Sequence, residues 1–345
     1  MPEPTTRAVF IERLGPPEAL VEREVPLQPL GPDRLQLEVH AAGVNFADLL
    51  QRAGLYGTVP PRPYSPGFEV AGEVVRVGSA VTDWRVGDRA IALLRYGGYA
   101  RDVVVTTRQV FRYPDALTPV QAAAVPVVFL TGWVCLFEAA RARAGETVLI
   151  LGAGGGVGTA AVQLAVQRGL KVIGTAGSQR KREFVMAELR AEACFDSRGA
   201  WEAEVHRVRP DGVDVALDPV GGPATASCRR LLASLGRLVC YGLSEAMPGG
   251  RRNWVKASWA YLRTPRFHPL ALFERNIGVF GVQLLHLWDR QELLGRALGE
   301  IYRGVVAGEL RPIIDRTFPL DRDGAVEAHR YLHDRRNLGK VVLAV

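Results

Sequence analysis

The sequence contains no apolar run of about 18 residues free of charge, so we expect no membrane-spanning helix. Its first residues, "MPEPTTRAVFIERLG", lack the apolar core of a signal peptide, which predicts a cytoplasmic protein. Cysteine is scarce: only Cys135, Cys194, Cys228 and Cys240 occur, and none of their spacings is typical of a zinc knuckle or a disulfide framework. We therefore expect the cysteines to be small buried hydrophobic residues.

Histidine is also scarce, with six residues in 345. Neither His40 nor any of the other five has a clustered metal-ligating partner in the sequence, so we expect surface or capping roles. The net charge is +7, and its excess is local, because the stretch 251–276 holds six Lys and Arg residues and one Glu, a net of +5. The chain as a whole is not polybasic, and we expect no nucleic-acid partner.

The length exceeds that of one ordinary hydrophobic core, which indicates two domains. Up to about residue 125 the chain is β-rich, with alternation in "RLQLEVHAAGV" and "YARDVVVTT" and dense Pro and Gly between them. The stretch 118–142 predicts a helix, a proline break and a second helix. Short apolar strands then alternate with helices, which is typical of a parallel sheet covered on both faces. The fold class is therefore α/β, a β-rich domain plus a doubly wound parallel sheet.

The expected strands of that sheet are "TVLILG", "KVIGTA", "ACFD", "VDVALD" and "RLVCYG", each followed by a turn. We expect helices at 156–168, 179–190 and 322–334, and a last strand in "GKVVLAV".

A glycine-rich loop, "AGGGVG", follows the first of these strands and opens a helix. Its Rossmann positions are Ala153, Gly155 and Gly158, so the first glycine of the fingerprint is replaced. Gly155 would let the backbone approach a pyrophosphate, and Gly158 would let helix and strand pack closely. The free N–H groups of the helix N-terminus favour an anion, so the loop predicts a dinucleotide site.

The next strand indicates which nucleotide is held. An NAD site usually has an acid about 20 residues after the loop, but no acid occurs between residues 169 and 182. Ser178, Arg180, Lys181 and Arg182 stand there instead and suit a 2′-phosphate. A solvated basic first turn of the helix is the alternative. NADPH is favoured, and NADH stays possible.

Six stretches together resemble one family: 41–57, 65–93, 122–133, the glycine loop, 216–222 and 337–343. The chain resembles the medium-chain dehydrogenase/reductase superfamily, in its zinc-free quinone oxidoreductase branch. The basic stretch and its flanks are similar to the synaptic vesicle amine transport protein homologues of that branch. The resemblance implies a GroES-like catalytic domain (1–127 and 289–345), a Rossmann domain (128–288), a cleft between them and a homodimer paired through the Rossmann sheets.

The resemblance also indicates that no zinc is bound. Zinc alcohol dehydrogenases of the superfamily carry a Gly-His-Glu motif, and the matching triplet here is Gly67-Phe68-Glu69. Phenylalanine cannot ligate a metal, and the four-cysteine structural zinc lobe is absent from the sequence. Hydride addition to an isolated ketone needs a Lewis acid or a positioned proton donor, whereas a conjugated acceptor spreads its charge into an enolate. We therefore expect an enone, a quinone or an enoyl thioester as substrate.

The resemblance implies catalytic roles for Asn45, Tyr56 and Thr131, near the nicotinamide and the substrate. A turn-capping Asn, a rim aromatic and a helix-face Thr are the structural alternatives. Asp48 and Arg52, four residues apart, are expected to pair with each other. Ser197 departs from the family, which often has a tyrosine near the 2′-phosphate. Besides Asn45, Thr131, Gly155, Gly158, Ser178 and Lys181, the expected cofactor contacts are Gly156, Val157, Tyr241, Gly242, Phe280, Val282, Asn337 and Lys340.

The stretch 251–276 interleaves its cations with Trp254, Trp259, Tyr261 and Phe267. It could narrow the substrate site near the cleft, its arginines could grip the phosphates of coenzyme A, or it could touch an anionic membrane surface. The sequence therefore predicts an NAD(P)H-dependent reductase of a conjugated C=C or a quinone. An enoyl-CoA reductase in acyl or secondary metabolism is the first alternative. A cofactor-binding scaffold or membrane-surface protein with little turnover is the second.

Overall fold

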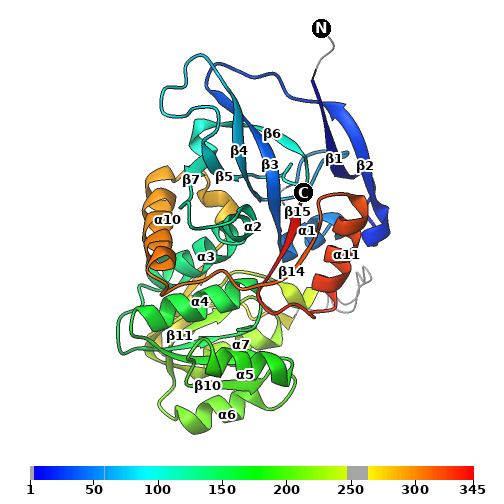
Figure 1. The fold of residues 1–345 in the computed structure, drawn as a ribbon. Coiled ribbons are helices and arrows are strands. Elements are labelled where there is room, and N and C mark those ends of the chain that lie inside the picture. Colours follow the sequence, from blue (N-terminus) through cyan, green and yellow to red (C-terminus); the bar gives the residue numbers. More distant parts are fainter. Residues whose placement is uncertain (1–3, 58, 247–262) are drawn as a thin grey trace.

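The computed structural model describes residues 4–57, 59–246 and 263–345. Two parts lie one above the other in Figure 1: a β-rich part that holds both ends of the chain, and an α/β part below it. Among the described residues, no helix combines the length and the apolar character that spanning a membrane requires.

The β-rich part is built on a seven-stranded sheet in which β14, β15, β3, β4, β5 and β7 follow one another, while β6 pairs with β3. Only β14 and β15 are parallel, and the other pairs are antiparallel. A separate antiparallel pair, β1 and β2, lies beside it. The strands are β1 (Thr5–Ile11), β2 (Leu20–Pro26), β3 (Arg34–Val44), β4 (Glu69–Val77), β5 (Arg89–Leu93), β6 (Asp102–Thr106), β7 (Val110–Arg112), β14 (Ile314–Pro319) and β15 (Lys340–Ala344).

The α/β part is built on a six-stranded, all-parallel sheet with the strand order β10-β9-β8-β11-β12-β13. This is the doubly wound Rossmann order, in which the first strand in the chain lies near the centre. The predicted α/β fold with a parallel sheet is confirmed. The strands are β8 (Thr147–Ile150), β9 (Lys171–Ala176), β10 (Ala193–Asp196), β11 (Val213–Asp218), β12 (Leu232–Cys240) and β13 (Gly278–Gly281).

The helices of the α/β part follow the predicted pattern, but α4 and α5 end earlier in the chain than we predicted. We predicted ends at residues 168 and 190, and the helices stop at Gln167 and Ala187; Arg190 then has a φ of 63°, which no helix continues. The proline break is also present, since one helix ends at Ala123 and the next begins at Pro126. The helices of this part are α4 (Gly156–Gln167), α5 (Gln179–Ala187), α6 (Trp201–Val208), α7 (Pro223–Leu231) and α9 (Pro269–Phe273).

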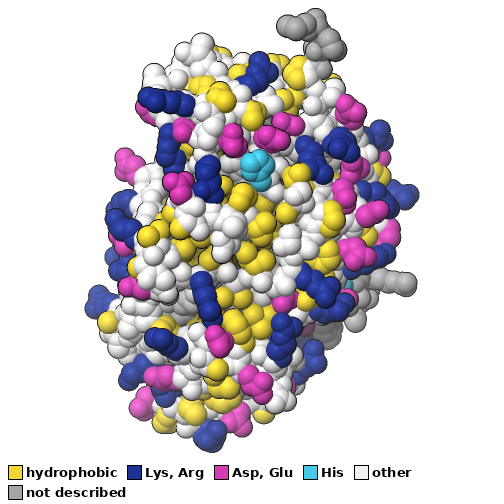
Figure 2. Space-filling view, in the orientation of Figure 1, with side chains coloured by type: hydrophobic (Ala, Val, Ile, Leu, Met, Phe, Trp, Pro, Cys, Tyr) yellow, Lys and Arg dark blue, Asp and Glu magenta, His cyan; other side chains and the backbone are white. Residues whose placement is uncertain are grey.

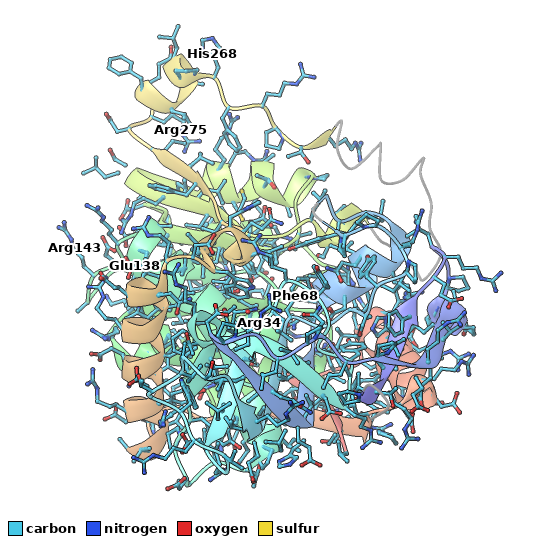
Figure 3. All side chains as sticks on the ribbon, turned by 90° about the horizontal axis from the view of Figure 1, so that it is seen from above. Arg34, Phe68, Glu138, Arg143, His268 and Arg275 are labelled. Atoms are coloured by element: carbon cyan, nitrogen blue, oxygen red, sulfur yellow. The ribbon has the colours of Figure 1, made fainter. Side chains whose placement is uncertain are left out.

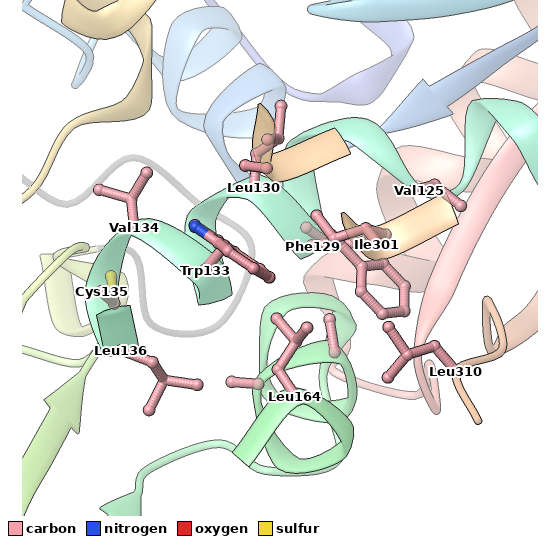
Figure 4. Close-up of a cluster of buried hydrophobic side chains, with 14 of the residues drawn as sticks. Val125, Phe129, Leu130, Trp133, Val134, Cys135, Leu136, Leu164, Ile301 and Leu310 are labelled. Carbon is pink, nitrogen blue, oxygen red and sulfur yellow. The ribbon is translucent and has the colours of Figure 1, made fainter. Parts of the chain in front are cut away.

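The remaining helices are α1 (Phe46–Ala53), α2 (Pro119–Ala123), α3 (Pro126–Trp133), α10 (Gln291–Val306) and α11 (Arg322–His333). Of these, α2 and α11 pack on the β-rich sheet and α1 packs on α11, whereas α3 packs on both β5 and α4. Figure 4 shows α3 side chains, including Phe129 and Trp133, in one buried cluster with Leu164 of α4 and Ile301 of α10. Because α3 packs on both neighbours, its N-terminus is fixed between the two sheets.

The described part of the basic stretch, residues 263–276, lies on the α/β part. Phe267 and Leu272 pack against the cluster under α7, and the Arg275 guanidinium donates to the carbonyls of Arg229, Arg230 and Leu232. In Figure 3, His268 and Arg275 stand well apart from Phe68. The predictions that concern residues 251–262, among them those for Arg251, Arg252 and the aromatic residues Trp254, Trp259 and Tyr261, lie outside the described residues.

Charge of both signs is spread over the face drawn in Figure 2. Lys and Arg side chains alternate there with Asp and Glu over both parts, and hydrophobic side chains gather between the two parts. This face therefore presents no continuous surface of one sign, which agrees with the local character of the charge excess in the sequence.

A substitution at Gly158 tests how closely the start of α4 packs against the loop that follows β8. A Cβ at Gly158 would lie 2.2 Å from the Gly152 carbonyl oxygen, so Gly158→Ala should destabilise the fold by about 1–3 kcal/mol. The control is Gly299→Ala in α10, where a Cβ meets nothing within 4 Å and should stabilise the helix by about 0.5–1 kcal/mol. Urea unfolding followed by circular dichroism measures both. Equal free energies of unfolding for the two variants would contradict the packing account.

Candidate functional site

A cavity of about 460 Å³ lies at the carboxyl ends of β8 and β9. This is where open α/β sheets bind their ligands. The glycine loop, the start of α5 and the C-terminal segment before β15 line it together. Seven of the residues predicted to contact a cofactor meet there: Gly155, Gly156, Val157, Ser178, Lys181, Asn337 and Lys340.

The other predicted contacts lie elsewhere around this edge of the sheet. Gly158 lies beneath the loop, against Gly152 and Ala153. Tyr241 and Gly242 follow β12, and Phe280 and Val282 lie in and just after β13. The Val282 N–H donates to the Cys240 carbonyl, which holds the two strand ends together. None of these residues is in the lining of the 460 Å³ cavity.

The altered first position of the glycine loop has a structural reason. Ala153 is fully buried, and a Cβ built on Gly174 of β9 would lie 2.8 Å from the Ala153 methyl group. The methyl group therefore fits because the neighbouring strand has a glycine opposite it. The loop is also held from outside, since the Gly339 N–H donates to the Gly154 carbonyl at 3.0 Å. The C-terminal segment thus braces the loop.

Of the predicted basic cluster after β9, only Lys181 lines the cavity. Its ammonium donates to the Arg335 carbonyl at 2.7 Å, and burial lowers its pKa. Arg180 and Arg182 instead pair with Asp315 and Asp196, at 3.3 and 3.1 Å.

The sequence did not single out two further cations of this cavity, Arg198 and Arg335. Arg335 donates to the Ser244 carbonyl at 3.1 Å. Arg198 directly follows Ser197, which also lines the cavity, so the departure at Ser197 was the signal that could have revealed it.

Asn45 lies at the start of α1, in a buried cluster with Glu69 and Lys340, and of these three residues only Lys340 lines the cavity. The Lys340 ammonium donates to Asn45 Oδ1 and to Glu69 Oε1, both at 2.6 Å. Asn45 Nδ2 donates to the same Glu69 oxygen at 2.9 Å. Lys340 and Glu69 form a fully buried ion pair, with side-chain exposed fractions of 3% and 0%.

Glu69 also forms a hydrogen bond with the N-terminal turn of α3. Its second oxygen accepts from the Val127 N–H at 2.7 Å, in the first turn of that helix. Thr131 follows Val127 by four residues, so both lie on one face of α3, and Thr131 is 7% exposed. A Cβ on Gly43 would lie 2.3 Å from Glu69 Oε1, so only glycine leaves room for this carboxylate. Nothing in the sequence around the Gly67-Phe68-Glu69 triplet indicates this role of Glu69, because its partners come from distant segments.

A second buried chain of hydrogen bonds starts at Asp48. Its carboxylate accepts from the backbone N–H groups of Asn45 (2.7 Å) and Gly67 (3.1 Å) and lies 3.2 Å from the Tyr99 hydroxyl. Tyr99 also contacts His329 Nε2 at 3.2 Å, and Arg52 Nε donates to His329 Nδ1 at 3.2 Å. Since Nδ1 accepts, Nε2 carries the proton and donates to Tyr99, which donates to Asp48.

The predicted direct pair of Asp48 and Arg52 was therefore wrong, since Tyr99 and His329 separate them. The expectation of surface or capping roles fails for His329, which is fully buried, whereas His268 does cap α9. Burial lowers the pKa of His329 well below its usual range and keeps the ring neutral. Burial also raises the pKa of Asp48 to about 7 and lowers that of Arg52 to about 10.

Tyr56 and Phe68 lie together beside this cluster, with ring centroids 5.9 Å apart. Gln283 Nε2 donates to the Tyr56 hydroxyl at 3.0 Å, and burial raises the pKa of Tyr56. Phe68 itself is buried, at 4% exposure. Within the described residues, no group of three or more His, Cys, Asp or Glu side chains could hold a metal ion.

Two family models match the chain. The alcohol dehydrogenase GroES-like domain matches residues 31–115, and the model described as zinc-binding dehydrogenase matches residues 189–343. The synaptic vesicle membrane protein VAT-1 homolog of Rattus norvegicus is 36% identical over 91% of this chain and 77% of its own length. The quinone oxidoreductase of Mus musculus is 30% identical over 98% of this chain and 97% of its own length.

Solved structures agree with this relationship. The Escherichia coli quinone oxidoreductase complexed with NADPH superposes with a TM-score of 0.87, at 26% identity, covering 98% of this chain and 100% of its own. The CurK enoyl reductase superposes with a TM-score of 0.82, at 27% identity, and the match covers 98% of this chain and 99% of its own. The chain is therefore an NAD(P)H oxidoreductase that belongs to the medium-chain dehydrogenase/reductase superfamily, in its zinc-free quinone oxidoreductase branch.

Proposed function

We propose that this protein is an NADPH-dependent reductase that transfers a hydride to a conjugated C=C or to a quinone. One observation carries the proposal. One cavity is lined by the glycine loop, by the cations Lys181, Arg198 and Arg335, and by Lys340, whose ammonium donates to the buried Asn45. The three cations suit a phosphorylated dinucleotide, and the Lys340 ammonium suits an acceptor that gains negative charge.

The cavity fits a dinucleotide. Gly155 precedes α4, and a Cβ there would lie 3.3 Å from the Gly152 carbonyl oxygen, so a side chain would crowd the loop where a pyrophosphate must approach. The N-terminus of α4 adds free N–H groups for the phosphates. Bound at this cavity, a reduced nicotinamide supplies the hydride. The loop and Asn337 are the residues that would hold it.

The preference for NADPH over NADH rests on Lys181, Arg198 and Arg335. These three cations line the cavity against one carboxylate, that of Glu245. The hydroxyls of Ser178 and Ser197 line the same end and can donate to a phosphate. Hydrogen bonds from cations to phosphate oxygens are among the strongest in proteins, so a 2′-phosphate gains more here than a 2′-hydroxyl.

The acceptor end favours flat, electron-poor substrates. We assign Asn45, Tyr56 and Thr131 to the acceptor, and the Tyr56 and Phe68 rings pack together outside the lining of the 460 Å³ cavity. A conjugated acceptor delocalises the charge that hydride addition creates, so a few polar contacts can hold it. The similarity to an enoyl reductase supports enoyl thioesters as one class of acceptor beside enones and quinones.

We also propose a homodimer. Within the described residues, β13 pairs only with β12, so its other edge is free to extend the sheet into a second copy. Apolar side chains lie exposed near this edge, among them Leu235, with an exposed fraction of 74%, and Phe280, with an exposed fraction of 42%. Exposed apolar side chains beside an unpaired strand favour association.

The cofactor preference predicts tighter binding of NADPH than of NADH. Lys181→Met should weaken NADPH binding about 10- to 100-fold and leave NADH nearly unchanged, because only the 2′-phosphate contact is lost. Dissociation constants from cofactor fluorescence measure this. Lys171→Met, at the exposed start of β9, is the matched control and should change neither. Equal weakening of both cofactors by Lys181→Met would contradict the assignment.

The acceptor class predicts NADPH oxidation with phenanthrenequinone, with a linear enone and with a crotonyl thioester, but none with cyclohexanone. The reason is that only conjugated acceptors delocalise the developing charge. Absorbance of the reduced nicotinamide measures each rate. Turnover of cyclohexanone at a rate matching the enone would contradict the proposal, and failure of every acceptor would favour a scaffold with little turnover.

The dimer predicts a mass of two chains by light scattering after gel filtration. Leu235→Asp should shift the protein to one chain, because a charge at the edge opposes burial there. Leu235 has a φ of 63°, which Asp adopts more readily than Leu, so the variant should fold. Val306→Asp, at an exposed site on α10, is the control. A wild-type mass of one chain would refute the dimer.

A further inference from the structure

We propose that the Lys340 ammonium provides, at the acceptor end of the cavity, the positive charge that a metal ion provides in zinc-dependent relatives. On this proposal Lys340 is a catalytic residue that holds the acceptor oxygen while hydride arrives, and Glu69 and Asn45 position it. The inference rests on the proposed function, since it presupposes an acceptor with a carbonyl oxygen.

The first step is the orientation of the Asn45 amide. The lysine ammonium can only donate, so the Asn45 atom that faces it at 2.6 Å must be the oxygen. The Glu69 carboxylate can only accept, so the atom that faces it at 2.9 Å must be the nitrogen. The two charged neighbours thus fix the amide in one orientation.

The second step is a count of donors. Asn45 Nδ2 has two hydrogens, which go to Glu69 Oε1 and to the Gly43 carbonyl at 2.9 and 3.5 Å. Both donors of the Asn45 side chain are therefore taken within this cluster. Lys340 has three hydrogens, and two go to Asn45 and Glu69. Within the described residues no acceptor takes the third, so Lys340 is the donor of this cluster that remains available to a ligand.

The third step is the location of the charge. Lys340 lines the cavity at the start of β15, and a Cβ on Gly156 would lie 3.9 Å from the Lys340 Cδ. Glu69 directly follows Phe68, which stands where zinc-dependent relatives have a histidine ligand. The residue that binds the ammonium is thus the next one in sequence after the position that the superfamily uses for its metal.

Burial strengthens the electrostatic interactions of the Lys340 ammonium with a bound ligand. Both side chains of the ion pair are almost fully removed from water, so electrostatic interactions there are weakly screened. The second oxygen of Glu69 accepts from the Val127 N–H in the first turn of α3, so the carboxylate binds both the ammonium and the positive end of a helix.

The chemical step balances without a metal. Hydride adds to the electron-poor carbon, and the π electron pair moves onto the carbonyl oxygen. The third N–H of Lys340 donates to that oxygen and keeps its proton. Water then supplies the proton that completes the product.

The test uses para-nitrophenol as a probe of the oxyanion in the NADP⁺-loaded protein. The absorbance of the phenolate reports its pKa in the site. In the wild type the bound phenol should have a pKa lowered by about one unit or more, as expected next to a cation, and Lys340→Met should abolish this shift. Lys340→Met should also lower kcat about 100-fold, as loss of an oxyanion donor does, with the NADPH dissociation constant within about threefold of wild type.

Three variants complete the design. Lys340→Arg keeps the charge and should retain most of the phenolate shift, whereas Glu69→Gln removes the counter-charge and should enlarge it. The charge-neutral double variant Glu69→Gln/Lys340→Met leaves no buried unpaired charge, and it replaces Lys340→Met if that variant does not fold.

Two results would overturn the inference. One is a phenolate shift that is absent in the wild type or unchanged in Lys340→Met. The other is a loss of NADPH affinity above tenfold with the shift retained, which would mean that Lys340 serves the cofactor. A wild type that shows the shift but reduces no acceptor would contradict the proposed function and leave the role of Lys340 supported.

Discussion

The site depends on one buried ion pair, that of Glu69 and Lys340. Three distant segments meet at it: the start of β4 with Glu69, the start of β15 with Lys340, and the start of α1 with Asn45. A fourth, α3, is tied to it through the Val127 N–H. Removing one partner of such a pair leaves an uncompensated buried charge, at a cost of about 3–5 kcal/mol. The pair therefore makes the geometry of the acceptor end and the stability of the β-rich part inseparable.

The C-terminal segment extends this constraint to the cofactor. Gly339 donates to the Gly154 carbonyl of the glycine loop, and the next residue is Lys340. Four residues before Gly339, the Arg335 carbonyl accepts from Lys181 at the other end of the cavity. One short stretch of chain thus contacts the glycine loop, Lys181 and the buried cluster of Asn45 and Glu69. A strand of the β-rich sheet can therefore align the two halves of the proposed cofactor and acceptor site.

Local patterns predicted the parallel sheet, the glycine loop and the helix after it, because apolar runs and glycine spacing are set by neighbouring residues. They could not predict Glu69, whose partners are separated from it by many residues and meet only in the fold. The expected pairing of Asp48 with Arg52 failed for the same reason, because the distant His329 intervenes. Among the cations after β9, only Lys181 faces the cavity, since acids from other segments pair with its neighbours.

The central claim is that one cavity binds NADPH by its basic end and the acceptor oxygen at Lys340. A crystal structure of the protein with NADP⁺ and para-nitrophenolate tests it most directly. The account predicts the 2′-phosphate among Lys181, Arg198 and Arg335, and the phenolate oxygen within hydrogen-bond distance of Lys340 Nζ. A phenolate oxygen bound away from Lys340, with the ammonium on the pyrophosphate, would contradict it.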